Sequence, residues 1–187
     1  ELPVPTRKNQ DWRFADLKKI RFTDLAPADP ATDPAALVAR AMTGRPENFA
    51  AHFVFANNRL IYSETADLPA GAICLPLKEA LATHGDLVRA HFLQEEKNLG
   101  GDKFAALHGA ATLSGLFVHF PKGCVSEKPV LVHHFSGGEA RAIFPHTLVV
   151  AEDHASVSIV DVFESIAPSE QTLNVGMVDL FADRGGK

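Results

Sequence analysis

The second half of the chain carries short apolar runs rich in Val, Leu, Ile and Phe, separated by Gly, Pro, Ser and Asp. Side-chain character alternates within 116–120 and 173–181, which is the periodicity of a β-strand. No segment between the runs has a helical pattern, which argues against βαβ units. Such short strands are typical of a sandwich, a barrel or a β-helix. We expect strands at 116–120, 130–135, 147–151, 157–163 and 173–181.

The first hundred residues have a mixed, mostly helical pattern. Asp33 followed by Pro34 predicts the N-cap and first position of a helix that stops before Gly44. Apolar residues on both sides of Asn57 and Asn58 predict a β-hairpin. Further helices are expected from Asn9 or Asp11 through Trp12 to Ile20, at 76–83, at 86–93 and, with Asp102 as the N-cap, through 111.

Composition narrows the class of protein. The 187 residues, 46% of them hydrophobic, suit one or two globular domains that need no disulfide staples. A net charge of −5 argues against a nucleic-acid partner. The apolar runs are far shorter than the ~20 residues of a membrane span, and the N-terminus has no apolar signal region. Two cysteines without a CxxC pair fit a reducing compartment, so we expect a cytoplasmic protein.

Histidines are the side chains that most invite a metal-binding interpretation. The second half holds His119, His133, His134, His146 and His154. Neighbours in a strand point to opposite faces, so His133 and His134 cannot reach one metal without a bulge. No HxH pair is present, and histidines facing solvent or lying in loops are the favoured interpretation. A small metal-dependent, cupin-like enzyme that uses histidines of the β half is the alternative hypothesis.

Other combinations of side chains in the sequence do not indicate a catalytic site. Cys124, His119 and Asp153 could form a nucleophilic site, but no spacing brings them together. GxSxG, P-loop, HExxH and GxGxxG motifs are absent from the sequence. A carbohydrate-binding β-helix is a third hypothesis, although the β half has no Tyr or Trp for sugar stacking. The sequence therefore assigns no catalytic and no metal residue, and leaves cofactor-binding residues unknown.

Four segments, in order along the chain, resemble the SufB/SufD family. The opening LPVPTRKNQDWRFADL is similar to the family's LPTRKNEDWRYTDL and favours the SufD type. Residues 53–60 resemble a vfvNGrl hairpin, with Asn58 at the usual glycine. Residues 102–108, 115–118 and 128–130 resemble the entry to the family's core, with His108 at the usual asparagine. The fourth segment, 145–155, is similar to PrtlVvaeehA.

The resemblance implies an α+β fold, with a helical N-terminal domain followed by the start of a right-handed parallel β-helix. We expect a mixed, mainly helical domain at 1–112 and the truncated beginning of the β-helix core at 113–187. It also implies a non-enzymatic scaffold of the SUF system, in complex with SufB and the ATPase SufC. Cluster-assembly residues of the family lie in the later β-helix, so none is carried over. We expect this chain to bind no cofactor, while the complex handles the iron–sulfur cluster.

Only six residues of the sequence follow the strand expected at 173–181. If the strands stack, this last strand lacks a neighbour, and such an edge pairs readily with another strand. We therefore expect the chain to be a fragment of a longer protein. Its last strand is expected to pack against a second copy, or to fray and aggregate at high concentration.

Overall fold

The computed structural model describes residues 2–15, 17, 20, 22, 24–94, 101–112 and 114–187. Its helices in these ranges are η1 (Gln10–Trp12, a 3-10 helix), α1 (Pro34–Met42), α2 (Leu77–Thr83), α3 (Gly85–His91) and α4 (Asp102–Ala111). The first strands are β1 (Ala26–Pro27), β2 (Ala51–Ala56), β3 (Arg59–Thr65) and β4 (Ile73–Pro76). The later strands are β5 (Gly115–Phe120), β6 (Val130–Ser136), β7 (Arg141–Ile143), β8 (His146–Ala151), β9 (Ile159–Ser165), β10 (Thr172–Asn174) and β11 (Met177–Ala182).

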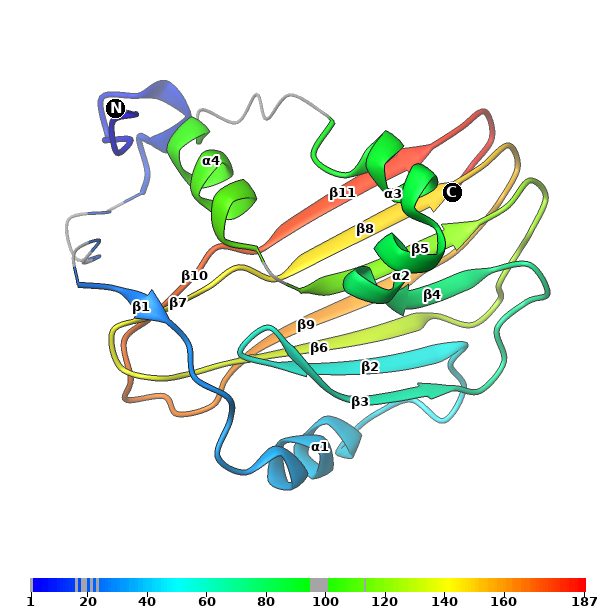
Figure 1. The fold of residues 1–187 in the computed structure, drawn as a ribbon, viewed down its shortest axis with the longest axis horizontal. Helices are drawn as coiled ribbons and strands as arrows, with labels where there is room; N and C mark the ends of the chain where they lie inside the picture. The colour runs from blue at the N-terminus through cyan, green and yellow to red at the C-terminus, as the bar shows by residue number, and fades with distance from the viewer. Residues whose placement is uncertain are drawn as a thin grey trace.

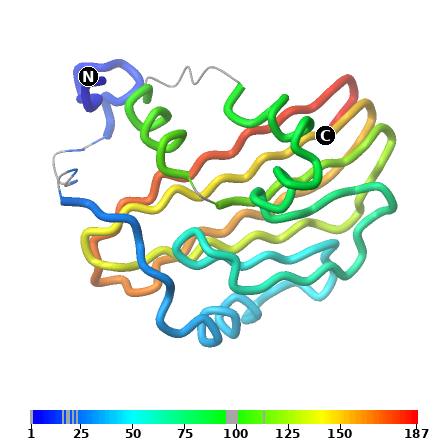
Figure 2. Tube along the Cα trace, in the orientation of Figure 1, coloured from blue at the N-terminus to red at the C-terminus, as the bar shows by residue number. Residues whose placement is uncertain are grey.

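Two four-stranded sheets form the body of the molecule (Figure 1). The β2 sheet has the order β3-β2-β6-β9, and the β5 sheet has the order β11-β8-β5-β4. A smaller sheet, β1-β7-β10, lies at one end. Strands β5, β8 and β11 are parallel, with Gly115 beside His146 and His146 beside Met177. Parallel strands are usually connected by helices, but here the chain leaves one sheet for another after each of β5, β6 and β8. Figure 2 shows these crossings along the trace.

The main core lies between the two large sheets. Leu116, Val118 and Phe120 of β5 are fully buried there, which confirms the face predicted for them. They pack with Phe53 and Phe55 of β2 from the opposite sheet. Burial of one such side chain contributes roughly 1.5–3 kcal/mol, so this layer is the principal source of stability.

Helices cover the outer faces of both sheets (Figure 1). Leu37 and Ala41 of α1 pack on Val54 and Phe135 of the β2 sheet. Ala80 of α2 and Val88 of α3 pack on Phe117, Leu148 and Val150 of the β5 sheet. Strands β2, β5 and β8 are therefore buried along their whole length. This two-sided burial explains why these strands are largely apolar at the positions facing the helices as well as at those facing the opposite sheet.

The expected fold class is wrong. The chain is mixed α/β, with parallel and mixed sheets, and does not form a helical N-terminal domain followed by a right-handed parallel β-helix. The first half contributes β2 and β3 to one large sheet and β4 to the other, and β3 and β4 run antiparallel to their neighbours. The physical reason lies in β2, whose apolar residues are buried on both faces where it pairs with β6. The boundary between 1–112 and 113–187 stays a prediction.

Two local predictions are confirmed in detail. Asp33 caps α1, because its side chain accepts a hydrogen bond of 3.0 Å from the backbone N–H of Ala36. Asn57 and Asn58 both have positive φ, at 48° and 62°, between β2 and β3. Two left-handed residues at the centre of a two-residue loop are typical of a type I′ hairpin, in which asparagine is favoured.

Three other predictions differ from the structure. At Trp12 the structure has the short 3-10 helix η1, which ends at Trp12 itself, and part of the expected helix falls on residues 16, 18 and 19, which lie outside the described ranges. The N-cap of α4 is Gly101, and its first residue is Asp102. The apolar run 173–181 is divided into β10 and β11 around Gly176. Gly176 lies close to Phe163, where an added Cβ would approach the ring to 3.3 Å.

Gly115→Ala tests the close pairing of β5 and β8. A Cβ at Gly115 would lie 2.1 Å from the carbonyl oxygen of His146, so the strands must separate. We expect a loss of about 2–4 kcal/mol of stability and a fall in Tm of about 4–16 °C, measured by thermal unfolding. Gly109→Ala in α4, where the nearest atom is 3.4 Å away, is the control. An unchanged Tm for Gly115→Ala would contradict the pairing.

Leu180→Asp tests the edge formed by β9 and β11. This edge exposes apolar side chains: Val160, Phe163, Val178 and, at 67%, Leu180. Exposed apolar strand edges favour association. We expect the mass from light scattering to rise with concentration for the parent chain, and to rise less for Leu180→Asp. Leu81→Asp on α2, at a leucine 44% exposed, is the control. A parent chain that stays monomeric throughout the series would disprove self-association.

Candidate functional site

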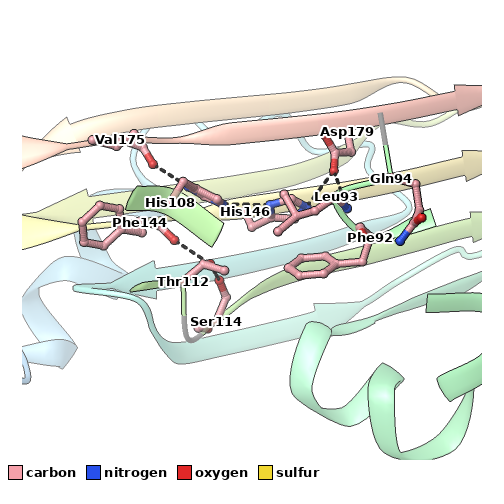
Figure 3. A network of polar contacts seen from close by, with 10 residues as sticks. All are labelled: Phe92, Leu93, Gln94, His108, Thr112, Ser114, Phe144, His146, Val175 and Asp179. Carbon is pink, nitrogen blue, oxygen red and sulfur yellow. Dashed lines mark hydrogen bonds and ion pairs between the residues drawn. The ribbon is translucent and has the colours of Figure 1, made fainter. Parts of the chain in front are cut away.

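A buried polar cluster connects α4 to the β5 sheet (Figure 3). His108 of α4 bonds the carbonyl oxygen of Val175 through Nδ1, at 2.8 Å. Its Nε2 lies 3.0 Å from Nδ1 of His146 in β8. The carbonyl can only accept, so His108 carries a proton on Nδ1, and in the neutral ring its Nε2 accepts from His146. On the other side of His146, Nε2 is 3.6 Å from Asp179, whose carboxylate accepts from the backbone N–H of Leu93.

Two further contacts fix the helix and the rings at this place. The hydroxyl of Thr112 donates to the carbonyl oxygen of Phe144, at 2.9 Å. The ring of Phe92 packs on His146, with centroids 4.6 Å apart. Both histidines are fully buried. A buried polar group without a partner costs roughly 1–3 kcal/mol, so the paired imidazoles hold α4 in one position on the sheet.

A second polar chain crosses the outer face of the β2 sheet. The hydroxyl of Tyr62 and Nη1 of Arg45 both donate to Glu64, at 2.6 and 2.7 Å. Nη1 of Arg45 is also 3.4 Å from Nδ1 of His52, whose Nε2 lies 3.0 Å from Nδ1 of His133. Arginine only donates, so His52 accepts at Nδ1 and, as a neutral ring, donates from Nε2 to His133. The chain of donors therefore fixes the tautomers of both rings.

Burial gives this pair an unusual protonation behaviour. Desolvation, followed by the charges of His133 and Arg45, lowers the pKa of His52 to about 4. Desolvation also lowers the pKa of His133, although Glu164 opposes the shift. Both rings are therefore neutral at neutral pH, in agreement with the donor directions. A proton added to His133 at Nδ1 would face the N–H of His52 and break the chain.

A third histidine lies at the end of the β5 sheet. Nε2 of His119 is 3.0 Å from Glu152, and the other carboxylate oxygen accepts from the backbone N–H of Lys122, at 2.9 Å. The hydrogen bond from His119, and then the one from Lys122, lowers the pKa of Glu152. This arrangement ties the turn after β5 to the end of β8.

The hypothetical nucleophilic site of Cys124, His119 and Asp153 is not assembled. His119 bonds Glu152, and the Cys124 thiol lies 4.0 Å from the carbonyl oxygen of Ala70, to which it donates. Burial raises the pKa of the Cys124 thiol. Burial also raises the pKa of Cys74 to about 12. Both thiols are therefore protonated at neutral pH, and the thiol form is a poor nucleophile and metal ligand.

The five histidines of the second half are distributed over separate surfaces. His133 faces outward from β6 and His134 faces the space between the sheets, which confirms that the two point to opposite faces. His119 and His146 lie on the outer face of the β5 sheet, and His154 lies exposed in a turn. In the described part of the chain, no three His, Cys, Asp or Glu side chains are arranged to hold a metal ion.

Sequence reasoning missed the partners of these histidines: His52, His108, Glu152, Asp161 and Asp179. These five residues come from different parts of the chain, each far in sequence from the histidine that it meets. His108 and His146, for example, are 38 residues apart. Only the strand register could have revealed such pairs.

None of the described helices is long and apolar enough to cross a bilayer.

His52→Gln tests the neutral histidine pair. The folded-state pKa of about 4 lies below the unfolded value of about 6.5, so the unfolded chain binds more protons as the pH falls between these values. Stability present above pH 6.5 is therefore lost on acidification, by at most about 1.4 kcal/mol per pH unit for one proton. The measurement is the free energy of unfolding, obtained by chemical denaturation at several pH values between 7 and 5. Plotted against pH, it should have a smaller slope for His52→Gln than for the parent. His154→Gln, in the exposed turn, is the control, and an unaltered slope for His52→Gln would refute the assignment.

Comparison with known proteins places these features in a family. The family model for the SufBD protein N-terminal region matches residues 1–132. The iron–sulfur cluster assembly protein SufD of Bacillus subtilis is 33% identical over 106 residues, which cover 56% of this chain and 24% of that protein. SufB of the same organism is 28% identical over 116 residues, covering 62% of this chain and 25% of SufB.

A longer match comes from Synechocystis. Its iron–sulfur cluster assembly SufBD family protein is 25% identical over 170 residues, covering 89% of this chain and 37% of that protein. The chain thus spans between 24% and 37% of the length of these curated relatives. The family model covers well over half of the chain, and the relatives carry the same family name. The chain belongs to the SufB/SufD family of iron–sulfur cluster assembly proteins.

Proposed function

We propose that this chain is part of a SufD-type scaffold subunit that supports iron–sulfur cluster assembly in a complex with SufB and the ATPase SufC. The observation that carries the proposal is the match to the SufBD N-terminal region over residues 1–132. The match to SufD of Bacillus subtilis, at 33% identity, favours the SufD type. A cytoplasmic location stays a prediction.

The geometry of the buried polar groups supports a structural role. Imidazoles and carboxylates engage one another inside the molecule, as His108 does with His146 and His119 with Glu152. They connect helices and turns to strands, which is what a rigid scaffold requires. The chain itself then performs no catalysis, and the histidines of the β half, distributed over separate surfaces, do not favour the cupin-like alternative.

The two thiols support a division of labour within the complex. Cys74 is buried in β4, with a pKa of about 12, and burial also raises the pKa of Cys124. Cluster ligation uses thiolates, so protonated thiols held by burial are unfavourable ligands. The nascent cluster is then held by other parts of the complex, while this chain provides packing surface.

The test is co-expression of this chain, carrying an affinity tag, with SufB and SufC from the same host. We expect all three proteins to elute together and to stay together in size-exclusion chromatography with light scattering. A tagged unrelated domain of similar size is the control. Elution of the chain without either partner would overturn the proposed scaffold role.

Anaerobic reconstitution then tests where the cluster is held. We expect iron and sulfide to appear in the complex and not in the chain alone. The double variant Cys74→Ser and Cys124→Ser should assemble complex and cluster like the parent, because neither thiol is a ligand. A stoichiometric cluster on the isolated chain, lost in the double variant, would contradict this assignment.

A further inference from the structure

A groove separates the helix pair α2 and α3 from the C-terminal end of α4, on the outer face of the β5 sheet. Figure 1 shows the two groups of helices beside each other over this sheet. The groove has a volume of about 540 Å³, and both groups of helices contribute residues that line it. It is a different surface from the edge formed by β9 and β11.

The α2–α3 side of the groove is apolar at helical spacing. Leu77 and Leu81 are four residues apart on α2, and Val88 and Phe92 are four residues apart at the end of α3. Residues at i and i+4 lie on one face of a helix, so each helix presents an apolar ridge to the groove. Val88 is buried, whereas Leu81 is 44% exposed. The ridges therefore extend from the core to the surface, where their outer part faces water.

The α4 side of the groove has small side chains and is firmly anchored. Thr112 and Ser114 face Phe92 across the groove (Figure 3), and Gly109 lines it one turn earlier. Because Gly109 has no side chain, another chain can approach the backbone of α4 closely there. The buried hydrogen bonds of His108 and Thr112 hold this wall in place. A wall that exists before binding lowers the cost of ordering a complex.

The charged side chains that line the groove are cations. They are Lys78 of α2 and Arg89 of α3, both exposed, and no Asp or Glu is among the described residues of the lining. Arg89 lies 3.4 Å from Asp86, but both of these side chains are largely exposed. An ion pair of this kind is weak, so the guanidinium stays available to another carboxylate. The groove is therefore complementary to an apolar surface flanked by acidic groups.

Shape and charge together favour a helix as the occupant. A ridge of i, i+4 side chains packs into the groove between ridges of other helices. Amphipathic helices bind apolar grooves in this way, through anchors at i, i+3, i+4 and i+7. We propose that the groove binds an acidic amphipathic helix of a partner protein, with its apolar face on Leu81 and Phe92 and its carboxylates beside Lys78 and Arg89. The proposal goes beyond the scaffold role and does not depend on SufB or SufC as the partner.

A fluorescent helical peptide of about 14 residues, roughly 21 Å long, tests the groove on the full chain. It carries leucines at i, i+3, i+4 and i+7, glutamates on both flanks of this apolar face, and alanine elsewhere. We expect saturable one-to-one binding in fluorescence anisotropy, which weakens as salt screens the charges. A second peptide with lysine in place of each glutamate should bind about tenfold more weakly.

Charge reversal in the protein should reverse this preference. The double variant Lys78→Glu and Arg89→Glu should lose about tenfold in affinity for the acidic peptide and should bind the lysine peptide better than the parent does. Leu81→Asp should weaken the acidic peptide by a similar factor. Arg59→Glu is the matched control, because it reverses an exposed cation on β3 of the other large sheet, and it should bind like the parent. Circular dichroism checks the folding of every variant.

Several results would overturn the proposal. Equal affinity of the parent for the two peptides, or no saturable binding of the acidic one, would exclude an acidic helix. Saturable binding of decanoate by a parent chain that does not bind the acidic peptide would assign the groove to small amphipathic anions. Self-association of the parent that is lost in Leu81→Asp would assign it to a second copy of this chain.

Discussion

The in-register parallel pairing of β5, β8 and β11 is the constraint on which the rest of the structure depends. Gly115 allows β5 to approach the carbonyl of His146 so closely that no side chain fits between them. Once this register is set, alternate residues face either the opposite sheet or the covering helices. Polar residues in these strands therefore lie on one of the two faces of the sheet. Each can contact only the residues that pack against its own face.

This sorting explains where sequence-based prediction succeeded and where it failed. Local patterns sufficed for the cap at Asp33, the hairpin at Asn57 and the apolar face of β5, because each depends on neighbours in sequence. The short strand β4 was missed, since Ile73–Pro76 is only four residues long and leads directly into a helix. The fold class was missed because the pairing of β2 with β6 leaves no periodic signal in either strand.

The candidate site was still less accessible from the sequence. His108 stands where the family's usual asparagine is expected, and nothing near it in the sequence indicates a second imidazole. The partner, His146, follows from the packing of α4 on β8. In the same way, the neutral state of His52 follows from burial beside Arg45 and not from its neighbours in the strand. The type of residue was visible in the sequence, whereas its protonation and its partner were not.

The buried histidines differ in how the fold satisfies them. His52 and His133 are joined by a hydrogen bond whose direction Arg45 dictates, so the pair needs nothing further. His134 and Asp161 are equally close but not aligned, and stacking with phenyl rings, rather than hydrogen bonding, sets the imidazole plane. The Asp161 carboxylate is nevertheless not left alone, because the hydroxyl of Thr147 donates to its second oxygen at 3.1 Å and the imidazole of His134 lies beside the first. The fold therefore secures this pair from two sheets at once, since β6 and β9 belong to one sheet and Thr147 of β8 to the other.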